Sequence, residues 1–204
     1  MRAGAGRRDS QGRAVILETV VTTRDESGRD HIAPMGIREQ DGFIVLSPFR
    51  PSATLEHVAR EKCAVVNYTD DVRIFAGCLT GRYDWPTVPV NHLPCRRLAA
   101  SLAHSEVKLE RVEDDATRPR LYCRELARET HGAFRGFNRA QAAVIEAAIL
   151  VSRLNMLPQE KIDTEMAYLR IAVEKTAGPR ELEAWGWLAA RIEEFRVRNK
   201  ERSA

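Results

Sequence analysis

An arginine and two hydroxyl side chains lie within five positions of one another in the segment SPFRPSATLEHV, residues 47–58. An apolar run ends just before this segment, and its second half has the amphipathic pattern of a short helix. The first turn of a helix has unpaired N–H donors and a partial positive charge, to which Arg50 adds a charged fork and Ser52 and Thr54 add hydroxyls. This strand-to-helix corner therefore predicts an anion site suited to a phosphate. A helix cap beside a solvated arginine is the alternative.

Residues 33–36, Ala-Pro-Met-Gly, could place their backbone against a flat ring. Pro34 has no N–H to donate to a sheet, so the segment is predicted to be a strand edge, a bulge or a strand end. Gly36 carries no side chain and lets its backbone approach a ligand closely. Met35 also fits a hydrophobic core.

A third polar group ends the strand predicted over residues 63–68. Asn67, Thr69 and Asp71 supply amide, hydroxyl and carboxylate groups there, which suit the edge of a ring. The segment also reads as a polar turn, and Asp70 and Asp71 are expected to take hydrogen bonds from neighbouring N–H groups rather than to hold a metal.

The segments that must position these groups have the residue pattern of an antiparallel sheet up to about residue 78. A polar turn over 24–29 predicts one hairpin, and Asp41-Gly42 predicts a second tight turn. The strands are predicted over residues 15–23, 31–37, 43–46, 63–68, 106–112 and 120–126.

The sequence pattern changes twice in the rest of the chain. Residues 79–103 are rich in proline and predict a long irregular loop with a helical turn over 96–102. From about residue 137, apolar side chains recur at three- and four-residue steps and predict three amphipathic helices, with ends at Pro158 and Gly178-Pro179.

These elements predict an α+β fold, with an antiparallel barrel of about six strands followed by a small C-terminal helical subdomain. The predicted divisions are a disordered tail over residues 1–13, the barrel over 14–136 and the helical subdomain over 137–204.

Composition excludes several classes of function. The 204 residues are 44% hydrophobic and 30% charged, which is typical of a globular protein with a substantial core. The net charge of +3 arises from 32 basic residues interspersed with 29 acidic ones, so no nucleic-acid surface is expected. No apolar run suits a signal peptide or a membrane span, and a cytoplasmic location is expected.

The cysteines and histidines show no metal-ligand spacing. The four cysteines are far apart and include no C-x-x-C pair, so reduced, buried thiols are expected. His92, His104 and His131 lie in predicted loops or at the ends of elements, and no metal site is predicted.

Four segments together resemble a known family. The chain looks like a member of an uncharacterised archaeal and bacterial family of flavin-reductase-like proteins, with an FMN-binding split β-barrel and a helical C-terminal domain. The likeness covers nearly the whole chain from about Val15. The segments that carry it are ETVVTTRDESGRDHIAPMG, SPFRPSATLEHV, AVVNYTDDVRIFAG and FNRAQAAVIEAAILVSRL.

The resemblance implies a site for FMN. The phosphate would be held at the strand-to-helix corner by Arg50, Ser52, Ala53 and Thr54. The isoalloxazine would lie against the backbone of Ala33, Pro34, Met35 and Gly36, with an N–H near Gly36 facing N5. The ring edge or ribityl chain would be reached by Asn67, Thr69 and Asp71. Such folds generally form homodimers with the flavin at the interface, and the loop around Trp85 is a candidate to complete the partner's pocket.

Three functions remain open. The first is an FMN-dependent oxidoreductase that passes hydride from NAD(P)H to an unknown acceptor. The others are a flavin-binding carrier or sensor without turnover, and a flavin-free barrel that acts as an interaction module. The sequence has no G-x-G-x-x-G, G-x-S-x-G or H-E-x-x-H motif, so any nicotinamide would bind transiently over the flavin, and the flavin would carry the redox chemistry.

Overall fold

The structure of the protein is a computed structural model that describes residues 15–203. The tail predicted over 1–13 lies outside the described residues. The described chain folds into two compact units. The barrel unit contains residues 15–69 and 85–133, and the helical unit contains residues 70–84 and 134–203.

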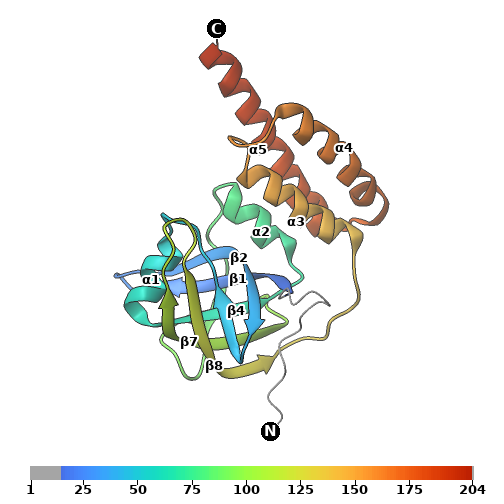
Figure 1. The fold of residues 1–204 in the computed structure, drawn as a ribbon. Helices are drawn as coiled ribbons and strands as arrows, with labels where there is room; N and C mark the ends of the chain where they lie inside the picture. Colours follow the sequence, from blue (N-terminus) through green and yellow to red (C-terminus); the bar gives the residue numbers. More distant parts are fainter. Residues whose placement is uncertain (1–14, 204) are drawn as a thin grey trace. The chain divides into compact units, whose positions relative to one another are not determined.

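Six antiparallel strands of the described chain form a closed barrel in the order β1-β2-β3-β8-β7-β4 (Figure 1). The barrel closes through the pairing of β1 with β4. The predicted α+β fold with a split barrel is confirmed. The barrel strands are β1 (Ile16–Arg24), β2 (Asp30–Gln40), β3 (Phe43–Leu46), β4 (Cys63–Tyr68), β7 (Ala103–Glu113) and β8 (Arg120–Thr130).

The short strand β3 leaves part of β2 uncovered. Asp41 and Gly42 form the predicted turn between them, and both have positive φ values (52° and 79°), as a tight hairpin turn requires. β3 pairs with β2 only from Ile37 onward, whereas β1 pairs with β2 along residues 30–38. Among the described strands, residues 30–36 of β2 therefore have a neighbour on one edge only.

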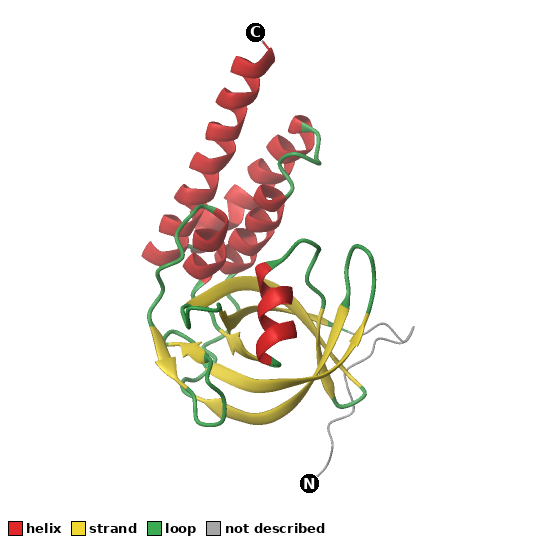
Figure 2. Ribbon diagram, turned by 90° about the vertical axis from the view of Figure 1, so that its left-hand side faces the viewer, coloured by secondary structure: helices red, strands yellow, loops and turns green. Residues whose placement is uncertain are grey.

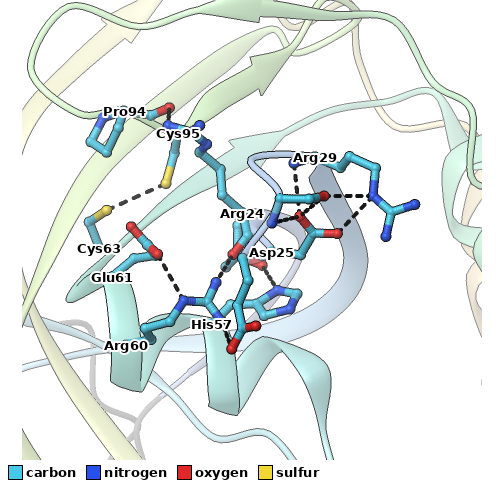
Figure 3. Close-up of polar contacts among 12 residues, drawn as sticks. Arg24, Asp25, Arg29, His57, Arg60, Glu61, Cys63, Pro94 and Cys95 are labelled. Atoms are coloured by element: carbon cyan, nitrogen blue, oxygen red, sulfur yellow. Dashed lines mark hydrogen bonds and ion pairs between the residues drawn. The ribbon is translucent and has the colours of Figure 1, made fainter.

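Helix α1 (Ala53–Glu61) follows β3 and lies across one side of the barrel (Figure 2). The hydroxyl of Ser52 caps its N-terminus, and Val58 is fully buried in the barrel core. At the other end, the guanidinium of Arg60 donates a hydrogen bond to the carbonyl oxygen of Arg24 at 2.7 Å (Figure 3). Both ends of the helix are thus fixed, which holds its first turn in place at the corner.

The proline-rich loop contains a short hairpin instead of the predicted helical turn over 96–102. Strands β5 (Thr87–Pro89) and β6 (Arg96–Leu98) form a separate two-stranded sheet. The loop packs on the barrel through Cys95, whose sulfur lies 3.4 Å from that of Cys63 (Figure 3). The prediction was wrong because the pairing of two three-residue strands in a hairpin overrides local helical preference.

The helical unit contains the three predicted helices and one that was not predicted. The helices are α2 (Val72–Leu79), α3 (Arg139–Ser152), α4 (Gln159–Thr176) and α5 (Pro179–Ser203). Val72 and Ala76 of α2 are buried in the same apolar cluster as Ala140 and Val144 of α3. Because of this packing, residues 70–84 belong to the helical unit, although the sequence placed them in the barrel.

None of the helices formed by residues 15–203 has both the length and the apolar character needed to cross a bilayer.

Candidate functional site

A pocket of about 340 Å³ opens where β2 passes the strand-to-helix corner. We call it the corner pocket. It brings together two segments that the sequence singled out, the Ala-Pro-Met-Gly stretch of β2 and the start of α1. The residues that line it are His31, Ala33, Pro34, Met35, Gly36, Ser47, Pro48, Phe49, Pro51, Ser52, Thr54 and Arg118.

The β2 wall of the corner pocket comes from the part of the strand that β3 does not cover. Backbone groups of successive strand residues point to opposite edges, so part of the backbone over residues 33–36 faces away from β1. A Cβ built on Gly36 would lie 2.8 Å from Cγ2 of Ile16. The missing side chain therefore makes room for a side chain of β1, while Pro34 removes one N–H from this wall.

The opposite wall is the N-terminus of α1. Ser52 caps the helix because its hydroxyl accepts from the N–H of Leu55 at 3.4 Å. The first turn leaves the N–H groups of Ala53 and Thr54 without an acceptor inside the helix, and these donors carry the positive end of the helix dipole. Ser52 and Thr54 line the pocket, whereas Ala53 does not.

The cation at the corner pocket is Arg118, not Arg50. The Nε of Arg118 donates to the carbonyl oxygen of Ser47 at 2.8 Å, and its guanidinium carbon lies 4.7 Å from the ring centre of Phe49. Among the described residues that line the pocket, it is the only arginine or lysine. A fixed, permanently charged guanidinium beside a helix N-terminus is the donor set that a phosphate prefers.

Arg50 instead holds the turn that carries Arg118. Its Nη2 donates to Oδ1 of Asp114 at 2.6 Å, and its Nε donates to the carbonyl oxygen of Asp115 at 3.2 Å. Its backbone N–H donates to the carbonyl oxygen of Thr117 at 2.9 Å. The predicted phosphate ligand is therefore engaged with the turn between β7 and β8, next to the pocket but outside its lining.

One buried hydroxyl in the lining lacks a partner. Ser47 is 4% exposed, and its Oγ makes no hydrogen bond to any described residue. An unsatisfied buried polar atom costs about 1–3 kcal/mol, so such atoms in native proteins usually face a ligand or a water molecule. Because Ser47 belongs to the lining, this hydroxyl is a candidate partner for a ligand or a water molecule in the pocket.

His31 borders the same pocket and favours its neutral form. Burial lowers the pKa of this imidazole from its usual value of 6.5, and the charge of His57 lowers it further. The two rings meet edge to face with their centres 5.1 Å apart. At neutral pH, Arg118 is therefore the main positive side chain at the pocket.

Asn67 is not brought to the corner pocket. It is fully buried, and its Nδ2 donates to the carbonyl oxygen of Val20 at 3.0 Å and to Oγ1 of Thr22 at 2.9 Å. Its Oδ1 accepts from the N–H of Leu98 at 2.8 Å. The amide thus joins β4, β1 and β6 within the barrel unit.

Thr69 and Asp71 are also outside the lining. Thr69 donates from Oγ1 to the carbonyl oxygen of Ala100 at 3.1 Å. Asp71 belongs to the helical unit, where it caps α2 through the N–H of Arg73 and forms an ion pair of 2.6 Å with the same residue. The sequence placed these polar side chains correctly at a strand end, but their hydrogen bonds stabilise the surrounding loops.

Comparisons with known structures identify the same architecture. The crystal structure of the FMN-bound protein MM1853 from Methanosarcina mazei is 20% identical, with a TM-score of 0.77 over 88% of this chain and 96% of that one. A putative flavin reductase with a split barrel domain from Shewanella frigidimarina is 13% identical, with a TM-score of 0.52 over 62% of this chain and 75% of that one. The flavin reductase of a styrene monooxygenase from Pseudomonas putida S12 is 14% identical, with a TM-score of 0.50 over 57% of this chain and 82% of that one.

A search of curated proteins finds no match. Residues 17–132 match a family model described as the N-terminal domain of a protein of unknown function (DUF447). Residues 138–190 match a second model of a protein of unknown function (DUF447). The two matches follow one another along most of the chain, and the MM1853 structure carries the same family designation. The resemblance seen in the sequence is thus confirmed, and the chain belongs to the DUF447 family, whose fold is that of the flavin-reductase split barrels.

Proposed function

We propose that the chain binds FMN in the corner pocket and acts as an NAD(P)H-dependent, flavin-reductase-like oxidoreductase with an acceptor still to be identified. The observation that carries the proposal is the pocket itself, where an open strand edge, a helix N-terminus and an arginine meet. The fold shared with the FMN-bound protein MM1853 supports the choice of flavin.

The pocket residues fit a phosphorylated flavin. The helix N-terminus, the hydroxyls of Ser52 and Thr54 and the guanidinium of Arg118 form a donor set for a phosphate. The unpartnered hydroxyl of Ser47 supplies one further donor or acceptor within the same lining. The β2 edge over residues 33–36 offers a flat, largely apolar wall for a ring.

FMN, when bound, would supply the redox centre, accepting a hydride from NAD(P)H and passing the two electrons to an acceptor. The chain's own residues need only hold and orient it. Arg118 and the first turn of α1 would fix the phosphate end, and residues 33–36 would fix the ring by backbone contacts. Neutral His31 leaves the β2 side of the pocket without an added positive charge.

The protein is also proposed to act as a homodimer. A volume of about 340 Å³ is at the lower end of the range for ligand pockets, so a second subunit is needed to enclose a ligand as large as FMN. Large apolar side chains are exposed on the barrel unit at Val15, Ile16, Leu17 and Leu126, with 38–48% of their surface accessible. Such side chains are suited to burial in an interface. Light scattering of the full chain should give twice the chain mass.

The test of the proposed function combines binding with reduction. FMN is titrated into the purified full chain, and NADH or NADPH is then added without oxygen while the visible flavin absorbance is followed. Saturable binding and bleaching by one nicotinamide are expected. Binding without bleaching would identify a carrier or sensor instead, and absence of FMN binding would leave the flavin-free interaction module.

A further inference from the structure

Two histidines and a glutamate meet at the end of the long β7–β8 hairpin, away from the corner pocket. Cross-strand register places His104 of β7 opposite Glu129 of β8, and His131 follows β8 directly. His104 Nδ1 and His131 Nε2 are 2.8 Å apart. With one carboxylate oxygen of Glu129, the ligand atoms of the three residues all lie within 4.8 Å of one another.

We infer that His104, Glu129 and His131 form a binding site for a first-row transition metal ion, with Zn²⁺ as the best match. Two imidazoles and one carboxylate are ligands that Zn²⁺ commonly takes in proteins. Three protein ligands leave a fourth position of a tetrahedral ion open to water. The site lies at the ends of β7 and β8 and shares no residue with the lining of the corner pocket.

The buried ring of His104 is oriented as a metal ligand would be. His104 is 1% exposed, and its Nε2 makes no hydrogen bond to any described residue. That nitrogen lies 3.9 Å from Oε1 of Glu106, a fully buried carboxylate. A nearby anion favours the proton on Nε2, which leaves the lone pair of Nδ1 directed toward His131. Metal-bound histidines commonly donate a hydrogen bond from their other ring nitrogen to a carboxylate, and Glu106, at 3.9 Å, lies just beyond that distance.

The carboxylate behind His104 is held in place by hydrogen bonds from the loop that carries Asn91 and His92. The backbone N–H of His92 donates to Oε2 of Glu106 at 2.9 Å. The His92 Nδ1 and the Asn91 N–H lie 3.0 and 3.2 Å from Oε1. Glu106 is therefore held at a fixed position beside the ring of His104.

The same loop positions the carboxylate ligand. Nδ2 of Asn91 donates to Oε1 of Glu129 at 2.8 Å. One residue thus contacts both the ligand Glu129 and the supporting carboxylate Glu106, as a partner outside the direct ligands is expected to do. His131 is exposed at the mouth of the cluster, which gives an ion access from solvent.

Metal binding requires the two more accessible ligands, His131 and Glu129, to move. In the absence of an ion, one ring nitrogen donates to the other across 2.8 Å. Two nitrogens on one tetrahedral Zn²⁺, each about 2.0–2.1 Å from the ion, are about 3.3 Å apart. The exposed His131 would have to withdraw by about half an ångström and turn, because the two rings now face each other edge to edge with their centres 5.0 Å apart, and the Glu129 oxygen would have to approach from within 4.8 Å.

The test measures Zn²⁺ affinity of the tag-free full chain by competition with a chromophoric chelator. One ion per chain is expected. His131→Ala and Glu129→Gln should each weaken binding by about a hundredfold or more, and Asn91→Ala by about tenfold. These positions are used because His104 is buried and its replacement could unfold the barrel. Co²⁺ bound to the wild-type chain should show the visible absorption of a four-coordinate site.

Matched controls are His31→Gln and Glu125→Gln, which alter a histidine outside the cluster and another glutamate of β8. Both should bind Zn²⁺ as the wild type does. The inference is overturned if the wild-type chain binds no Zn²⁺, or if His131→Ala and Glu129→Gln bind it with unchanged affinity. Either result would leave the two imidazoles as a hydrogen-bonded pair that only joins the strand ends.

Discussion

Removal of the Arg118 guanidinium should weaken the binding of the phosphate end of FMN and leave the binding of its ring nearly unchanged. In Arg118→Ala, the contacts with the Ser47 carbonyl oxygen and the Phe49 ring are lost together with the positive charge. A hydrogen bond to a charged group contributes about 1.5–3 kcal/mol, and the exposed position of Arg118 favours the lower half of that range. A loss of about 1.5–2 kcal/mol corresponds to FMN binding weakened about ten- to thirtyfold.

The assay is a fluorescence titration with FMN and, in parallel, with riboflavin, which lacks the phosphate. Arg118→Ala should weaken FMN binding and leave riboflavin binding nearly unchanged. Arg120→Ala is the matched control, because Arg120 lies two residues along and its guanidinium contacts Glu113 instead of the pocket. Arg118→Lys should recover part of the lost FMN affinity, since the lysine ammonium keeps the positive charge but lacks the planar guanidinium.

Arg50→Ala gives the sharpest comparison, because the sequence alone pointed to that residue. Arg50 holds Asp114 and Asp115 in the turn that carries Arg118, so its replacement should weaken FMN binding less than the loss of Arg118 does. Equal FMN affinity in Arg118→Ala and the wild type, or an equal loss of riboflavin and FMN, would refute the assignment of Arg118 to the phosphate. A larger effect at Arg50 would restore the original sequence-based assignment.

Three further predictions concern buried polar groups. Ser47→Ala should raise the unfolding free energy of the flavin-free chain by up to about 1 kcal/mol, because an unsatisfied hydroxyl is removed. The same change should weaken FMN binding about fivefold. Thermal melts with and without FMN would show these two opposite effects. Asn67→Ala should lower the unfolding free energy by about 1–3 kcal/mol in urea, since the N–H of Leu98 loses its acceptor; unchanged stability with lost FMN binding would instead give Asn67 a direct ligand role. Burial lowers the pKa of His31 and His57 below 6.5, so the unfolded chain binds more protons around that pH and the unfolding free energy should fall as the pH is lowered through 6.5; a flat or rising profile would contradict this.

Local patterns in the sequence were enough to predict the barrel strands and the three C-terminal helices. The polar turn over residues 24–29, the Asp41-Gly42 turn and the Ser52 cap are all local signals, and each is found in the structure. Helix α2 was missed because six of its eight residues are buried, so no polar face marks a helical period. Only the aspartates before it, one of which caps it, could have indicated a helix start.

The sequence predicted only the part of the candidate site that local residue patterns reveal. The residue types alone indicated a binding role for residues 33–36, Ser52 and Thr54. The structure brings these residues to one pocket. Arg118 could not be predicted, because the turn that carries it returns to the corner across 71 residues of chain. His104 and His131 are likewise joined by strand register across 27 residues, which no ligand spacing in the sequence reveals.

Helix α2 makes the helical unit discontinuous in sequence. The chain leaves the barrel after Thr69, returns at Trp85 and leaves again after Ala133, so a single cut cannot separate the two units. A fragment ending at residue 133 would keep α2 but lack α3 and α5, against which that helix packs. A fragment beginning at residue 134 would expose the apolar surface that α2 covers. Both fragments are therefore expected to aggregate, and exchange of the barrel for a homologous one by recombination would need several junctions in place of one.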